Sequence, residues 1–191
     1  RRLEGGTPSY IDLMLAYEGL KIRRKFGNEE KINVHLNGLA DRFYTKASKL
    51  KHSNGTPLLI FYQDQHEYPT FSFNIVKENG EIVNHNDINF AFNSLKINVR
   101  SGSHCNPGAT FSSLKWSPDE VVSFGEDSAL NNRCASSLCI VGGRPVSTLR
   151  ISFGYPSLPS DVDKFISVLE RLFVNGGPNP KPLENEVILP M

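Results

Sequence analysis

Apolar residues recur at helical spacing in the first fifty positions of the chain and again towards its end. A first helix is predicted from Thr7-Pro8, where a capping hydroxyl precedes a proline at the first helical position, and Gly27 ends it. Asn28 is expected to cap a second helix, and Ser160 begins the last one. The second helix carries the clearest amphipathic stripe of the chain, which is formed by Ile32, Leu36, Leu39, Phe43, Ala47 and Leu50.

Between these helices the pattern is typical of strands. Short apolar or alternating runs, bounded by turn residues, predict strands over residues 58–62, 70–76, 97–100 and 147–153. Two further helices are expected, one capped at residues 85–87 and one begun by the capping box of residues 117–120. Residues 125–147 are expected to form an irregular loop around a short element. Strands that alternate with helices indicate an α/β fold with a mixed sheet over residues 56–174.

The composition argues against several classes of protein. The 191 residues contain 21 Lys and Arg against 20 Asp and Glu, so the basic surface of a nucleic-acid-binding protein is not expected. No apolar run is long enough to cross a bilayer, so no membrane association is expected. Three cysteines, an odd number, argue against a disulfide framework and favour a reducing, cytoplasmic location. Cys134, Cys139 and His104 lack the second ligand pair that a zinc site needs, so no metal site is predicted.

One turn of the chain has the composition of a reactive-thiol site. Residues 99–108 place Cys105 directly after His104 and five positions after Arg100, in a run broken by glycine and proline. The thiolate is the nucleophilic form of cysteine, and a neighbouring cation or a row of free backbone N–H groups stabilises that anion. A cysteine is also often a small buried apolar residue, so this turn alone leaves both interpretations open.

Four stretches occur in an order that a known family shares. Residues 3–9 contain Gly-Gly-Thr-Pro-Ser before a helix, and residues 100–108 are Arg-Ser-Gly-Ser-His-Cys-Asn-Pro-Gly. Residues 116–120 open a helix with Trp-Ser-Pro-Asp-Glu, and residues 142–165 hold Gly-Gly-Arg-Pro, a strand and a closing helix. This ordered set resembles the cysteine desulfurases of the class V aminotransferase-like group. It is most similar to the NifS-like domain of eukaryotic molybdenum cofactor sulfurases, including the fungal ones.

The resemblance implies the carboxy-terminal part of a fold-type I enzyme, whose small domain has a mixed sheet covered by helices. Its expected divisions are the end of the large cofactor-binding domain, a linking helix, the small α/β domain and a linker or tail, at residues 1–27, 28–55, 56–174 and 175–191. Pyridoxal 5′-phosphate is the implied cofactor. Gly6 and Thr7 match the turn that reaches the cofactor phosphate of the neighbouring subunit. The lysine that would form the Schiff base lies outside this chain, so the chain on its own is expected to be inactive.

The resemblance also implies roles for four residues. Cys105 would attack the sulfur of L-cysteine and carry it as a persulfide, with alanine as the other product, and His104 would be an acid, a base or a thiolate partner. Arg150 would bind the substrate carboxylate, and Arg100 would add a second positive charge. Cys105 is therefore expected in a solvent-reachable loop after a strand, with Arg150 on the same face of the small domain.

The implied sulfur acceptor is the molybdenum cofactor or a molybdoenzyme, and the full-length protein is expected to be a homodimer. Two other functions stay open. One is another activity of the class V group, with a different sulfur acceptor or with epimerase-like chemistry. The other is a non-catalytic dimerisation or binding domain in which Cys105 is structural.

Overall fold

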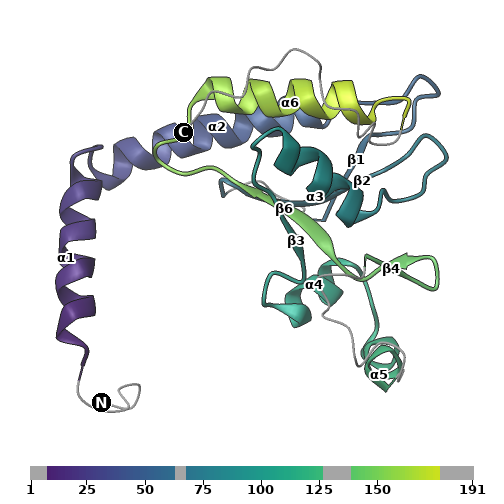
Figure 1. Cartoon of the computed structure of the whole chain (residues 1–191), viewed down its shortest axis with the longest axis horizontal. Coiled ribbons are helices and arrows are strands. Elements are labelled where there is room, and N and C mark those ends of the chain that lie inside the picture. The colour runs from purple at the N-terminus through teal and green to yellow at the C-terminus, as the bar shows by residue number, and fades with distance from the viewer. Residues whose placement is uncertain (1–7, 63–67, 127–138, 177–191) are drawn as a thin grey trace.

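The computed structural model describes residues 8–62, 68–126 and 139–176 of the chain. Within these ranges the elements are, in order, α1 (Tyr10–Arg24), α2 (Glu29–Ala47), β1 (Leu59–Phe61), β2 (Thr70–Ile75), α3 (His85–Ser94), β3 (Arg100–Gly102), α4 (Pro107–Ser113), α5 (Pro118–Glu126), β4 (Ile140–Val141), β5 (Arg144–Pro145), β6 (Thr148–Ser152) and α6 (Pro159–Phe173). Helices and strands alternate along much of the chain, so the predicted α/β class is confirmed (Figure 1). None of the described helices is long and apolar enough to cross a membrane.

The caps of the first two helices decide where each begins. The Asn28 carboxamide oxygen accepts the Lys31 N–H at 3.0 Å, so α2 begins where the sequence predicts. The start of α1 at Thr7-Pro8 is corrected, because the Ser9 hydroxyl accepts the Asp12 N–H at 3.4 Å and the helix begins only at Tyr10. In Figure 1, α1 extends away from the rest of the chain.

The main sheet has the strand order β1-β2-β6-β3, and each neighbouring pair is antiparallel. The expectation of a mixed sheet is therefore corrected for the described strands. Helix α3 carries the chain from β2 to β3, so that these two strands run parallel, as alternation of strand and helix predicts. However, β6 lies between them and is antiparallel to both. Alternation along the sequence predicts the direction of a strand but not which strand becomes its neighbour.

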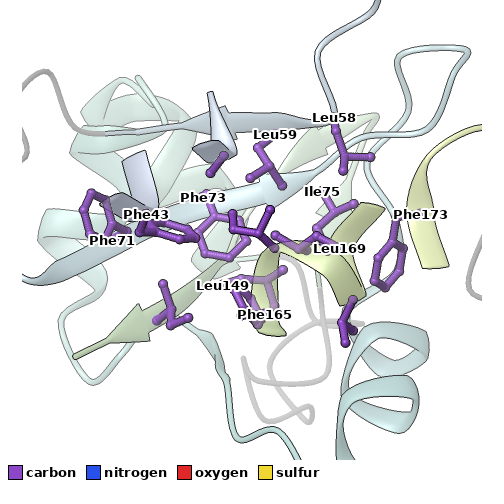
Figure 2. Close-up of a cluster of buried hydrophobic side chains, with 14 of the residues drawn as sticks. Phe43, Leu58, Leu59, Phe71, Phe73, Ile75, Leu149, Phe165, Leu169 and Phe173 are labelled. Carbon is purple, nitrogen blue, oxygen red and sulfur yellow. The ribbon is translucent and has the colours of Figure 1, made fainter. Parts of the chain in front are cut away.

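One face of the sheet packs against α2 and α6, which lie side by side in Figure 1. Phe71 and Phe73 of β2 point into this layer together with Leu149 of β6, as Figure 2 shows. The ring of Phe43, on α2, is fully buried at the centre, with its centroid 4.8 Å from Phe71 and 6.0 Å from that of Phe165 on α6. The amphipathic stripe predicted for the second helix is thus the side that covers the sheet.

The opposite face of the sheet is polar. Because side chains alternate between the two faces of a strand, Ser72 and Asn74 point away from the phenylalanine layer. Arg150 of β6 lies opposite Ser72 on one side and opposite Arg100 of β3 on the other, so all three share this polar face. Thr148, two residues before Arg150, lies on the same face.

A short helix follows β3 where the sequence predicts only an irregular loop. In α4, Pro107 takes the first helical position and the Asn106 carboxamide oxygen accepts the Ala109 N–H at 3.2 Å. The capping box of α5 is confirmed, because the Ser117 hydroxyl accepts the Glu120 N–H at 3.3 Å and the Glu120 carboxylate accepts the Ser117 N–H at 2.7 Å. The short element expected within residues 125–147 is the hairpin of β4 and β5.

Candidate functional site

Cys105 lies in a tight turn between β3 and α4, and its side chain is exposed. The Asn106 N–H donates to the Ser103 carbonyl at 2.9 Å, which closes the turn. Both central residues, His104 and Cys105, have positive φ, at 55° and 61°. For residues other than glycine, this left-handed backbone conformation costs about 1–2 kcal/mol each. The turn therefore persists only because surrounding contacts hold it.

Among the described residues, the hydrogen-bond partner of the Cys105 thiol is Arg100. Its Nη2 donates to Sγ of Cys105 at 2.7 Å, and both side chains are exposed. A guanidinium beside sulfur is a partner that stabilises the thiolate, which is the attacking form of cysteine. The placement of Cys105 after a strand and in reach of solvent agrees with the expectation from the sequence.

Arg100 and Arg150 lie directly opposite each other on neighbouring strands. Like charges in this position repel each other, so an isolated pair is unfavourable. Within residues 8–62, 68–126 and 139–176, neither arginine forms an ion pair with a carboxylate. An anion bound between them would relieve the repulsion and could use the two-pronged geometry of a guanidinium. The polar face of the sheet therefore has the chemistry of a carboxylate site, next to the Cys105 thiol.

The ring of His104 is held by β6 and not by the neighbouring thiol. Its Nε2 lies 2.9 Å from Oγ1 of Thr148, while its buried Nδ1 has no hydrogen-bond partner in the described part of the chain. Burial, followed by the positive charges of Arg150 and Arg100, lowers the pKa of His104 to about 4. The imidazole is therefore neutral at pH 7.

Sequence reasoning missed a buried polar network beside this turn. His85, in the first turn of α3, contacts Asn74 of β2 through Nε2 at 2.9 Å and the Ser147 hydroxyl through Nδ1 at 3.1 Å. The Asn74 amide donates to the Tyr62 hydroxyl and to the Ser147 carbonyl, both at 3.1 Å. The sequence gives little signal for it, because Asn74 continues the polar alternation of Thr70 and Ser72 along β2, and only its burial in the folded chain shows that its amide needs partners.

Acid is expected to destabilise the protein through His85. Burial, and then the neighbouring His104, lower the pKa of His85 from 6.5 to about 4. On unfolding, the ring would take up a proton below about pH 6.5, so its contribution to stability is present above that pH and is lost as the pH falls towards 4. The thermal unfolding temperature of the full-length protein should therefore fall more between neutral pH and about pH 5 than that of His85→Gln, which cannot titrate. An equal fall in both proteins would contradict this assignment.

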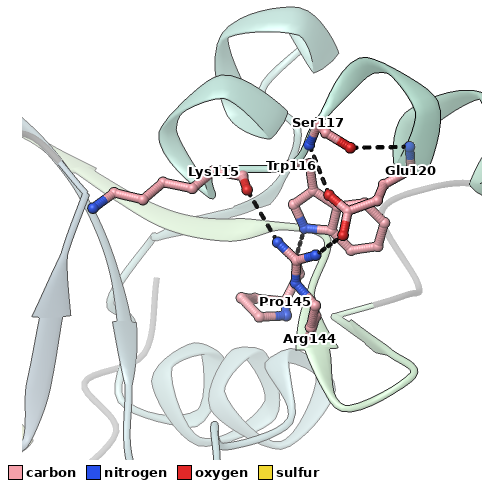
Figure 3. A network of polar contacts seen from close by, with 6 residues as sticks. All are labelled: Lys115, Trp116, Ser117, Glu120, Arg144 and Pro145. Atoms are coloured by element: carbon pink, nitrogen blue, oxygen red, sulfur yellow. Dashed lines mark hydrogen bonds and ion pairs between the residues drawn. The ribbon is translucent and has the colours of Figure 1, made fainter.

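A second polar cluster, drawn in Figure 3, has a structural role. Arg144 forms an ion pair with Glu120, donates to the Lys115 carbonyl at 3.1 Å and stacks on Trp116, with its guanidinium carbon 4.6 Å from the ring centroid. The Trp116 Nε1 donates to the Pro145 carbonyl at 2.9 Å. These contacts attach the β4–β5 hairpin to α5. The guanidinium of Arg144 is thus already paired with a carboxylate, whereas those of Arg100 and Arg150 have no carboxylate partner among the described residues.

The described residues do not include every residue that the sequence analysis selected. Gly6 and Thr7 lie outside them, and so does Cys134. Cys139 is described and is buried. No group of three or more His, Cys, Asp or Glu side chains within the described ranges could hold a metal ion.

Comparison with known proteins gives two results. A family model described as aminotransferase class-V matches residues 1–165. The molybdenum cofactor sulfurase of Aspergillus niger is 31% identical over 188 residues, which are 93% of this chain and 22% of that protein. The corresponding protein of Bos taurus is 31% identical over 191 residues, covering 95% and 21%. Molybdenum cofactor sulfurase 2 of Aedes aegypti is 27% identical over 188 residues, covering 91% and 24%. The chain thus spans between a fifth and a quarter of the length of these relatives.

Proposed function

Because the chain belongs to the class-V aminotransferase family, we propose that it is the carboxy-terminal part of a cysteine desulfurase. The enzyme would take sulfur from L-cysteine onto Cys105. It would supply this sulfur for the sulfuration of the molybdenum cofactor, because the relatives are named molybdenum cofactor sulfurases. Pyridoxal 5′-phosphate is the proposed cofactor, since this family depends on it. The acceptor would be the molybdenum cofactor or a molybdoenzyme.

The observation that supports this proposal is the combination of an exposed thiol with two arginines that have no described carboxylate partner. Arg100 donates to the Cys105 sulfur, and Arg150 lies opposite Arg100 on the polar face of the sheet. An amino-acid substrate brings both a carboxylate for a guanidinium and a sulfur for the thiolate to attack. The described residues therefore fit the substrate end of such a site. Gly6 and Thr7, proposed to hold the cofactor phosphate, lie outside the described residues.

The proposed reaction transfers one sulfur atom. The bound cofactor would supply an electron sink that lets the carbon–sulfur bond of the substrate break. The Cys105 thiolate would attack the substrate sulfur, so that a sulfur–sulfur bond forms while the carbon–sulfur bond breaks and its electron pair stays with the carbon. That carbon takes up the proton that the Cys105 thiol has lost, which gives alanine and a Cys105 persulfide.

Each side chain of the site would have its own task in this reaction. Arg150 would bind the carboxylate of L-cysteine, and Arg100 would hold the Cys105 thiolate in place. His104 is not proposed as the base or as a cationic partner of the thiolate, because its lowered pKa makes the neutral ring a weak proton acceptor and its Nε2 contacts Thr148. It would instead support the turn that carries Cys105.

The domain division expected from the sequence is retained as a proposal. Helix α1 has no buried residue, and its apolar side chains include Tyr10, Ile11, Met14 and Tyr17, which are 61–73% exposed. A helix with this much open apolar surface needs cover from another part of the full-length protein, which supports assigning residues 1–27 to the large domain. Residues 56–174 would form the small domain, to whose core α2 contributes. The full-length protein is proposed to be a homodimer.

Turnover of L-cysteine by the full-length, cofactor-loaded protein tests the proposed function. We expect one alanine to be released for each persulfide formed when no acceptor is present, because Cys105 can hold only one transferred sulfur. Alanine is quantified by chromatography, and the persulfide is trapped by alkylation and located by mass spectrometry. Conversion of an amino acid to its enantiomer without sulfur release would instead indicate epimerase-like chemistry. Absence of any turnover would favour a non-catalytic domain.

A further inference from the structure

We propose that His85 is a positioning residue that, through Ser147 and Thr148, fixes the turn carrying Cys105. The inference rests on the proposed function for its kinetic consequence, but its structural part concerns only this chain. His85 lies outside the reacting set, since its described partners are Asn74 and Ser147.

Both nitrogens of the His85 ring are used in the buried network. The side chain is 1% exposed, and the Asn74 carboxamide oxygen accepts its Nε2–H. The neutral ring then presents Nδ1 as an acceptor for the Ser147 hydroxyl. Asn74 uses its two amide protons on the Tyr62 hydroxyl and the Ser147 carbonyl. Ser147 is thus held through both its side chain and its backbone.

Ser147 directly precedes the residue that holds the cysteine turn. Thr148 is 2% exposed, pairs with Gly102 of β3, and lies with its Oγ1 2.9 Å from Nε2 of His104. His104 is in turn bonded covalently to Cys105. An unbroken series of contacts therefore runs from His85 through β6 to the thiol.

The backbone of the turn explains why such support is needed. His104 and Cys105 both have positive φ, which is unfavourable for residues with a Cβ atom. Strained residues persist only where their surroundings over-determine them. Among the described residues, Thr148 is the hydrogen-bond partner of the His104 ring. The position of the ring therefore depends on where β6 begins. A fully bonded polar network specifies one position for that strand, whereas an apolar contact would tolerate sliding.

Two replacements at position 85 separate positioning from simple burial. His85→Gln keeps one donor and one acceptor, while His85→Leu keeps bulk but removes both. In the full-length enzyme, we expect His85→Leu to lower the kcat of persulfide formation on the order of tenfold to a hundredfold, because a misplacement of about 1 Å at the attacking atom has effects of this size. The KM for L-cysteine should change less than kcat, because Arg150 is retained, although it lies on the same strand as Thr148. His85→Gln should recover most of the lost kcat.

A second variant and a second readout keep the test decisive if His85→Leu does not fold. Thr148→Val removes the hydroxyl that contacts His104 but leaves the network intact, and it should show the same fall in kcat with a smaller change in KM. The rate of Cys105 alkylation by iodoacetamide, measured without substrate, should change in His85→Leu and Thr148→Val but not in His85→Gln.

Three outcomes would overturn the positioning role. The first is a wild-type kcat and alkylation rate in Thr148→Val, and the second is a wild-type kcat and alkylation rate in a folded His85→Leu. The third is a fall in kcat in His85→Gln as large as that in His85→Leu. If the wild-type protein forms no persulfide at all, the proposed function fails. The alkylation rates then still decide whether His85 positions the thiol.

Discussion

Replacing Cys105 with alanine in the full-length protein is expected to abolish persulfide formation while L-cysteine still binds. The exposed sulfur beside Arg100 is the atom proposed to attack the substrate, and the variant lacks only that atom. Arg150 remains to bind the carboxylate, so the affinity for L-cysteine should be unchanged within about twofold. Persulfide trapping with increasing L-cysteine measures the first quantity, and the cofactor absorption change on cysteine addition measures the second.

Cys139→Ala is the matched control for this experiment. Its thiol is buried, so its removal should leave persulfide formation at the wild-type level. A persulfide formed by Cys105→Ala at the wild-type rate would refute the assignment of the nucleophile. Mass spectrometry of that product would then show whether Cys139 or Cys134 carries the sulfur.

Arg150→Ala should weaken the binding of L-cysteine tenfold to a hundredfold. A hydrogen bond to a charged group contributes about 1.5–3 kcal/mol, and this arginine would lose its bonds to the substrate carboxylate. Persulfide formation at saturating L-cysteine should fall less than the affinity, because Cys105 and Arg100 keep their contact. The dependence of the initial rate on L-cysteine concentration measures both effects.

Two further variants make the Arg150 experiment specific. Arg150→Lys keeps the positive charge but not the two-pronged donor geometry, so its affinity for L-cysteine should lie between those of wild type and Arg150→Ala. Arg42→Ala removes an arginine on α2 that pairs with Asp163 of α6, in the helix layer that covers the opposite face of the sheet from Arg150, and should leave the KM unchanged. An unchanged KM in Arg150→Ala would remove this residue from the substrate site.

Local sequence signals predicted the beginnings of α2 and α5 but placed that of α1 two residues too early. Asn28 and Ser117 cap the helices that their side chains indicate, because capping depends only on the next three residues. The α4 helix was missed because Pro107 and Gly108 resemble a turn in sequence, although proline is well suited to a first helical position. The position of β6 between β2 and β3 depends on contacts between distant segments, which short-range patterns do not contain.

The same difference in range explains which parts of the candidate site could be predicted. Arg100, His104 and Cys105 lie within six residues of one another, so they were recognised as one motif. The bond between Asn74 and Ser147 joins positions 73 residues apart, and no pattern along the chain connects them. The network around His85 therefore became visible only in the folded chain.

At the two positions of the cysteine turn with positive φ, the residue that would best stabilise the fold differs from the residue that the proposed reaction needs. Glycine is the residue that this backbone favours, and introducing it at position 104 or 105 would relieve part of the strain. It would also delete either the ring that contacts Thr148 or the thiol that contacts Arg100. Selection for a more stable fold and selection for a placed sulfur atom thus favour different residues at the same two sites. Libraries screened only for thermal tolerance would be expected to enrich glycine there and to lose the thiol site as they do so.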